Sequence, residues 1–277
     1  MVRARGVSKG IVWLSALLVG LLAGCGGFSG DDGQRPGSTE GNGRTEIVFL
    51  HHSTGGVIWE GGLETWLKDY NAAHGTDYAI VERDFPGEGY PWENYPYDYW
   101  NIWVEHAGER RYKKQDTLEI LTQSYDVIIW KHCFPVSLVE PDGDAPDIGS
   151  AVKTLGNYRL QYQALKEKMH QFPATQFIVW TGAAMLADTS DEASARRAQE
   201  FFEWVKGTWD EPGDNIYVWD FRQLETEEDL YLLDRYAAGP GDPHPNEAFA
   251  ARVAPYLGQR IVDVIEQRGD TGSLTGE

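Results

Sequence analysis

Three residues near the two ends of the chain are of the types that nucleophilic catalysis uses. Ser53 closely follows the apolar run 47–51, and a glycine-rich turn comes after it. Asp242 and His244 stand two positions apart, just before a long apolar-periodic segment. A serine hydroxyl attacks a carbonyl when a histidine takes its proton and a carboxylate orients that histidine. The three residues therefore predict serine-dependent acyl chemistry, provided that the fold brings them together.

Each of these residues also has a purely structural interpretation. A serine at the end of a strand is often a turn residue or a helix cap, and His244 alone could be a surface histidine. Asp242 precedes a helix-like segment, where an anion is stabilised by the helix dipole. The sequence leaves open whether Asp242 is the catalytic acid or a helix cap.

The segments that must position these residues alternate between strand-like and helix-like patterns. Short runs rich in Val, Ile, Phe or Trp are typical of parallel strands buried on both faces. The expected strands are 47–51, 78–82, 127–131, 177–180 and 216–219. The expected helices are 63–73, 117–124, 151–171, 194–206 and 247–267. This alternation predicts an α/β fold, a three-layer α/β/α sandwich with a five-stranded parallel sheet. Ligands of such sheets bind beyond the carboxyl ends of the strands, where Ser53 stands.

The segment around Ser53 and the segment Asp242–Asn246, which reads Asp-Pro-His-Pro-Asn, resemble the SGNH (GDSL-like) hydrolase superfamily. The resemblance covers about residues 45–268 and is carried mainly by its two ends. It implies a flavodoxin-like fold with Ser53 as nucleophile, His244 as base and Asp242 as the acid. Many members have two residues between the acid and the base, whereas only Pro243 stands there in this chain. The shorter spacing resembles acetyltransferase-like branches of the superfamily.

The same resemblance implies an oxyanion hole, a set of donors that stabilises the developing negative charge. The amide of Ser53 would be the first donor, and Gly87 or Gly89 would supply the second. The family's asparagine after the third strand is missing, because Lys131–Cys133 stands there. The open candidates for the third donor are Asn94, His132 and the amide of Cys133.

An aromatic segment, 90–103, follows the second expected strand. Exposed Trp and Tyr rings stack on sugars, and neighbouring acids and amides bind sugar hydroxyls. The residues that would form such a platform are Trp92, Tyr95, Tyr97 and Trp100. The alternative is a loop packed by its own rings.

Three other chemistries are not favoured by the sequence. Gly55 after Ser53 resembles the nucleophile elbow of α/β-hydrolases, but those enzymes build several strands before their nucleophile. The histidines include no pair with metal-ligand helical spacing, so we expect no metal and no cofactor. Cys133 and its neighbour His132 would point to opposite faces of a strand, which argues against a cysteine nucleophile.

The first residues resemble a bacterial lipoprotein signal. Three basic residues precede the apolar stretch 11–22, which is too short to span a bilayer, and Leu-Ala-Gly-Cys follows. We therefore expect a signal peptide at 1–24, a lipid on Cys25 that attaches the chain to a membrane, and a flexible tether over 25–44. The alternative is an ordinary signal peptide with an accidental cysteine. The expected domain is 45–268, and 269–277 is expected to be a disordered tail.

Charge and cysteine content narrow the possible partners. The formal net charge is -19, and removing 1–24, which holds three basic and no acidic residues, makes it -22. Such a surface repels nucleic acid and anionic polymers. Once Cys25 carries a lipid, Cys133 is the only thiol, so no intramolecular disulfide forms. We expect a monomer.

Together these features predict a lipid-anchored hydrolase in the bacterial cell envelope, outside the cytoplasm. Its expected substrate is an ester, such as an O-acyl group on a glycan. Acyl transfer to a sugar hydroxyl is a variant of the same chemistry. The alternative from another class is an inactive glycan-binding lipoprotein. The missing asparagine favours binding, whereas Ser53 and His244 favour catalysis.

Overall fold

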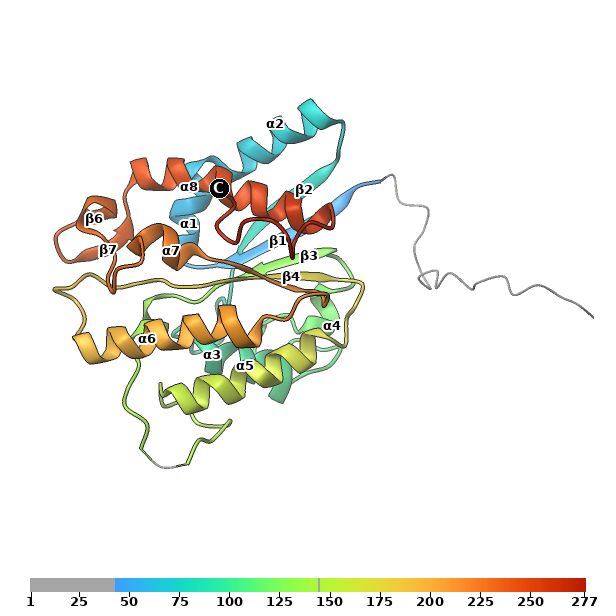
Figure 1. The fold of residues 1–277 in the computed structure, drawn as a ribbon. Coiled ribbons are helices and arrows are strands. Elements are labelled where there is room, and N and C mark those ends of the chain that lie inside the picture. Colours follow the sequence, from blue (N-terminus) through green and yellow to red (C-terminus); the bar gives the residue numbers. More distant parts are fainter. Residues whose placement is uncertain (1–42, 144) are drawn as a thin grey trace, which may run out of the picture. The chain divides into compact units, whose positions relative to one another are not determined.

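Five parallel strands form the central sheet, in the order β2-β1-β3-β4-β5 (Figure 1). They are β1 (Thr45–His51), β2 (Tyr78–Asp84), β3 (Val127–Trp130), β4 (Gln176–Trp180) and β5 (Ile216–Trp219). This arrangement confirms the predicted α/β fold and all five expected strands. The computed structural model describes residues 43–143 and 145–277. The predicted signal peptide, Cys25 and the tether as far as residue 42 lie outside the described residues.

Helices cover both faces of the sheet and complete the predicted three layers (Figure 1). On one face lie α1 (Thr54–Ile58), the π-helical turn η1 (Trp59–Leu63), α2 (Glu64–His74), α7 (Phe221–Thr226) and α8 (Glu247–Ile265). On the other lie α3 (Pro96–Trp100), η2 (Asn101–Glu105), α4 (Leu118–Leu121), η3 (Phe134–Ser137), α5 (Leu155–Met169), α6 (Glu192–Trp204) and η4 (Val205–Trp209). The five expected helices are present, although α4 and α5 are shorter than predicted.

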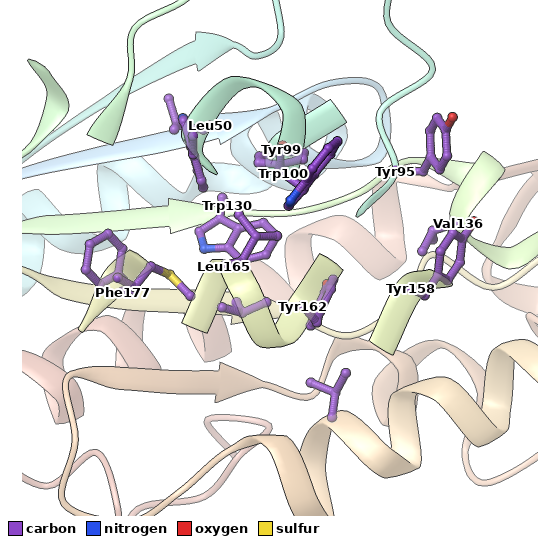
Figure 2. Packing of buried hydrophobic residues seen from close by; sticks show 14 of the residues in the cluster. Leu50, Tyr95, Tyr99, Trp100, Trp130, Val136, Tyr158, Tyr162, Leu165 and Phe177 are labelled. Atoms are coloured by element: carbon purple, nitrogen blue, oxygen red, sulfur yellow. The ribbon is translucent and has the colours of Figure 1, made fainter. Parts of the chain in front are cut away.

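The strands are apolar because side chains on both faces are buried. In β1, Ile47 and Phe49 pack toward α8, whereas Val48 and Leu50 pack toward α3 and α5. The core between the sheet and helices α3 and α5 is rich in aromatic rings. Figure 2 shows Tyr99, Trp100, Trp130 and Tyr162 packed together within it. No helix in the described part of the chain has the length and apolar composition of a membrane span.

The segment that holds Asp242 and His244 is an antiparallel hairpin, which the sequence analysis did not predict. A short 3-10 turn, η5 (Asp234–Tyr236), leads into β6 (Ala237–Gly239), and β7 (Asp242–Pro245) pairs with it. Gly241, with φ of 73°, makes the turn between the two strands. The hairpin packs against α1 through β7, which brings it to the helix that begins after Ser53.

The C-terminal segment 269–277 is ordered against the domain, so the prediction of a disordered tail was wrong. The carbonyl of Leu274 accepts a hydrogen bond of 2.8 Å from the amide of Asp220. The carbonyl of Thr275 accepts one of 2.9 Å from the indole N–H of Trp219. These backbone acceptors satisfy donors at the end of β5, a role that the polar composition of the segment does not reveal.

Candidate active site

Ser53 is exposed at the carboxyl end of β1, immediately before α1. Its backbone has φ of 51° and ψ of −108°, a region that residues with a side chain rarely adopt. Gly55 makes this sharp turn possible, because a Cβ there would lie 2.4 Å from the Cβ of His51. A backbone in such a region costs on the order of 1 kcal/mol, and residues of this kind cluster at functional sites.

The hairpin presents Asp242 and His244 to Ser53 from the same face of β7. Alternate side chains of a strand point the same way, so one intervening residue suffices to align acid and base. The Nδ1 atom of His244 lies 2.6 Å from Oδ1 of Asp242, and the same oxygen accepts a 3.1 Å hydrogen bond from the amide of His244. The Nε2 atom of His244 is hydrogen bonded to Oγ of Ser53. The structure thus brings the three predicted residues together.

These contacts determine the tautomer of His244. An ionised carboxylate can only accept hydrogen bonds, so Nδ1 carries the proton and Nε2 accepts the proton of the Ser53 hydroxyl. The hydrogen bond from His244 lowers the pKa of Asp242 below its ordinary value, so the carboxylate stays ionised further into the acidic range. The ring of Phe134 packs against the imidazole of His244, with centroids 5.0 Å apart and ring planes at 85°. This is the arrangement that a general base needs.

The structure also answers whether Asp242 caps the last helix. Asn246 is the N-cap of α8, and its side chain accepts a 2.9 Å hydrogen bond from the amide of Phe249. Asp242 is bonded to His244 instead. Its position therefore fits the acid of the site and not the helix cap.

The structure contradicts two of the predicted oxyanion-hole residues. The amide of Gly87 already donates to Oε1 of Gln115 at 2.6 Å. Asn94 is completely buried, and its side chain joins the carbonyl of Phe85 to the amide of Cys133. Asn94 is therefore a brace between the loops after β2 and β3. Gly89 is exposed beside Lys114 and stays a prediction.

The remaining candidates for the third donor are also engaged or inaccessible. The amide of Cys133 donates to both the carbonyl and Oδ1 of Asn94. His132 is completely buried among aromatic rings, and that burial lowers its pKa far below the ordinary value. Of the predicted donors, the amide of Ser53 is the one that belongs to the nucleophile itself.

The predicted four-ring sugar platform does not exist. Tyr95 and Trp100 are only 5% and 6% exposed, and both belong to the aromatic core (Figure 2). Tyr97 is half-buried and packs on both of them. These rings lie at the start of a helical segment, α3 and η2, whose inner face builds the core.

Trp92 is the exception, because it is 39% exposed and lies next to the nucleophile's turn. Its ring stacks on that of His52, with centroids 3.9 Å apart and planes 12° apart. His52 is also held by a 2.6 Å hydrogen bond between Nε2 and the carbonyl of Pro86, and burial lowers its pKa. The sequence patterns did not predict the contact between Trp92 and His52. The available signal was His52, a histidine immediately before Ser53, together with the tryptophan-rich segment 90–103.

Within residues 43–143 and 145–277, no three His, Cys, Asp or Glu side chains are grouped so that they could hold a metal ion.

No protein-family model matches the chain, and no curated protein matches it. Among solved structures, an acetyl xylan esterase, AlAXEase, has a TM-score of 0.45 at 15% identity, covering 76% of this chain and 96% of its own. A carbohydrate esterase family 2 enzyme with a carbohydrate binding domain, from Corynascus thermopiles (Myceliophthora fergusii), has a TM-score of 0.43 at 14% identity, with 82% and 67% covered. A gut microbial diltiazem-metabolizing enzyme has a TM-score of 0.43 at 10% identity, covering 83% of this chain and 48% of its own.

Proposed function

We propose that this chain is a serine hydrolase of the SGNH type that cleaves an ester bond. The observation that carries the proposal is the hydrogen-bonded series from Ser53 through His244 to Asp242. Each member has the hydrogen-bond partner that its role requires. Ser53 is also exposed, so that a substrate carbonyl can reach it.

In the first half of the reaction, Oγ of Ser53 attacks the ester carbonyl while Nε2 of His244 takes the hydroxyl proton. The resulting tetrahedral oxyanion accepts a hydrogen bond from the amide of Ser53. As the C–O bond of the ester breaks, His244 returns the proton to the leaving alcohol, and an acyl-serine remains. Asp242 keeps the imidazole oriented and stabilises its charged form throughout.

In the second half, His244 removes a proton from water, and the hydroxide attacks the acyl-serine. The carboxylic acid leaves and Ser53 regains its proton from His244. A sugar hydroxyl in place of water gives acyl transfer by the same steps. Because two predicted oxyanion-hole residues are engaged elsewhere, turnover should be slow; losing one such donor typically costs about 100- to 1000-fold in rate.

We propose an O-acyl group on a glycan as the substrate. The support is Trp92, an exposed ring beside the residue that precedes the nucleophile. A ring in that position offers a sugar a stacking surface next to the attacked ester. The alternative of an inactive glycan-binding protein relied on a four-ring platform, and burial of Tyr95 and Trp100 removes most of that support.

We further propose that the chain is attached to a membrane through a lipid on Cys25 and acts in the bacterial cell envelope as a monomer. The support is the pattern of basic residues, apolar stretch and Leu-Ala-Gly-Cys at 22–25. Because the net charge of -19 repels nucleic acid, we also propose that the protein does not bind nucleic acid.

A fluorophosphonate probe, which reacts with activated serines, tests the proposed chemistry directly. The purified chain should be labelled on Ser53, as located by peptide mass spectrometry. Ser53→Ala should not be labelled and should melt within a few degrees of the wild type. Replacing the exposed Ser273 by Ala should leave labelling unchanged. Labelling that persists in Ser53→Ala would refute the assignment.

A further inference from the structure

A buried lysine lies at the inner side of the nucleophile's turn. Lys131 follows β3 and is only 1% exposed. Its Nζ donates a 3.1 Å hydrogen bond to the carbonyl of His52, the residue before Ser53. It also lies 3.6 Å from Sγ of Cys133. The described residues include no ion pair between Lys131 and a carboxylate.

The alternation of β3 places this side chain on the face that α7 covers. Ile129 packs on that face, and Lys131 is two positions further along. Glu225 of α7 is also buried there, and one of its carboxylate oxygens accepts a 2.6 Å hydrogen bond from the amide of Ala184. The other oxygen has no partner among the described residues. Gly182 makes room for this carboxyl group, because a Cβ there would lie 2.6 Å from it.

Stability alone does not explain a lysine at this position. A buried charge without a paired carboxylate is unfavourable, and apolar residues often replace buried ions with a gain in stability. Burial lowers the pKa of Lys131. The arrangement therefore places a hydrogen-bond donor at an unfavourable site, and the group that receives its bond is the carbonyl of His52.

That carbonyl belongs to the same peptide group as the amide of Ser53. A trans peptide is planar, and its N–H points away from its C=O. A bond that holds the His52 carbonyl on the inner side of the turn therefore directs the Ser53 N–H to the opposite side. The amide of Gly55 bonds the same carbonyl at 3.0 Å, and donors on a carbonyl polarise its peptide group and strengthen the N–H as a donor.

We propose that Lys131 is a positioning residue, which holds and polarises the His52–Ser53 peptide so that the Ser53 amide donates to the oxyanion. This inference rests on the proposed hydrolase function and deepens it. Lys131 does not touch the substrate; it acts through the peptide group. It stands where the family resemblance expects the asparagine that supplies another donor. Lys131 would thus strengthen the donor that the nucleophile itself supplies.

The test compares two buried lysines that each donate to a backbone carbonyl. Lys131→Met should slow fluorophosphonate labelling and turnover of a small ester by about tenfold to a hundredfold. This is less than the loss expected when a whole oxyanion donor is removed, and the Michaelis constant should be unchanged. Lys166→Met is the control, because Lys166 is buried and donates a 2.6 Å hydrogen bond to the carbonyl of Trp209, although it also forms an ion pair with Glu211. It should lower the melting temperature and leave the labelling rate unchanged. Lys131→Gln keeps an N–H donor, so its labelling and turnover should be faster than those of Lys131→Met. If Lys131→Met does not fold, Lys131→Gln is compared with the wild type instead.

Labelling of the wild type at Ser53 tests the hydrolase function. The ratio of the labelling rate of Lys131→Met to that of the wild type tests the role of Lys131. The amide chemical shift of Ser53, measured by NMR in the same variants, reads the orientation of the peptide without any turnover. The Ser53 chemical shift should change in Lys131→Met and should keep its wild-type value in Lys166→Met. Equal labelling rates in wild type and Lys131→Met, an equal loss in both Met variants, or an unmoved Ser53 shift would overturn the inference.

Discussion

Oδ1 of Asp242 lies 2.6 Å from Nδ1 of His244 across a single intervening proline. The two side chains reach this distance because β7 is extended and alternate residues face the same way. A longer spacing in a loop achieves the same pairing in the family that the chain resembles. The short spacing is therefore a property of the hairpin and does not weaken the case for an acid and base pair.

We expect Asp242→Asn to lower turnover at least tenfold, because an amide at this position favours the wrong tautomer of His244. His244→Ala should cost nearly as much as Ser53→Ala, since groups that act as a unit are not additive. Turnover of a small ester measures both effects. The matched control is Asp191→Asn, which changes the acid that caps α6 and should leave turnover unchanged. Wild-type turnover in Asp242→Asn would show that this carboxylate has no role in the chemistry.

The sequence predicts the sheet well because its strands are buried on both faces. All four residues of β3, Val127–Trp130, are buried, so an apolar run marks the strand. The family resemblance also predicts the pairing of Ser53 with His244, and the two side chains are hydrogen bonded in the structure. Tertiary contacts of local elements are harder to predict. The hairpin of Asp242 is too short and polar to show a strand pattern, although Gly239-Pro240-Gly241 was a turn signal.

Aromatic composition was misleading because it does not distinguish a core ring from an exposed one. Tyr95, Tyr99 and Trp103 recur every four residues, which is the spacing of one helix face, and all three are buried. That periodicity was the available signal for a core. The role of Asn94 had no such signal, because its partners come from two loops that the sequence does not place side by side.

Glu225 should make stability depend on pH in a defined window. Burial raises the pKa of its carboxyl to about 8 in the folded chain, whereas the pKa of an unfolded glutamate is about 4.3. Between these values the folded state binds a proton that the unfolded state does not. The stabilising contribution of Glu225 to the free energy of unfolding is therefore fully present below about pH 4 and is lost as the pH rises through about 8.

Urea unfolding of Glu225→Gln tests this prediction, because glutamine keeps an oxygen for the amide of Ala184 and cannot titrate. Its unfolding midpoint, relative to that of the wild type, should increase as the pH rises from 5 to 8, a window that follows from the two pKa values. Glu167→Gln, an exposed change on α5, should follow the wild type. A constant difference between Glu225→Gln and wild type across the window would show that Glu225 does not titrate there.

Anchoring is tested at Cys25. A single acyl chain holds a protein only marginally, whereas two or more give lasting attachment. The wild-type chain should therefore partition with membranes, and Cys25→Ser should remain an unlipidated precursor. Cys133→Ser is the control, because that buried thiol should have no part in anchoring. Mass spectrometry of the mature amino terminus decides the matter: an unmodified cysteine or cleavage at another position contradicts the lipid anchor.

Trp92 and Trp100 form a matched pair that separates substrate contact from core packing. Trp92→Ala should raise the Michaelis constant for an acylated glycan several-fold, because one stacked ring contributes on the order of 1 kcal/mol. Turnover of nitrophenyl acetate should change little, since that substrate is too small to need the ring. The exposure of Trp92 predicts a small change in melting temperature. Trp100→Ala should instead destabilise the domain by about 3–5 kcal/mol, because its ring is buried in the aromatic core. If Trp92→Ala binds and cleaves the glycan ester as well as the wild type does, the ring next to His52 has no part in substrate recognition, and a small, non-glycan ester becomes the better candidate.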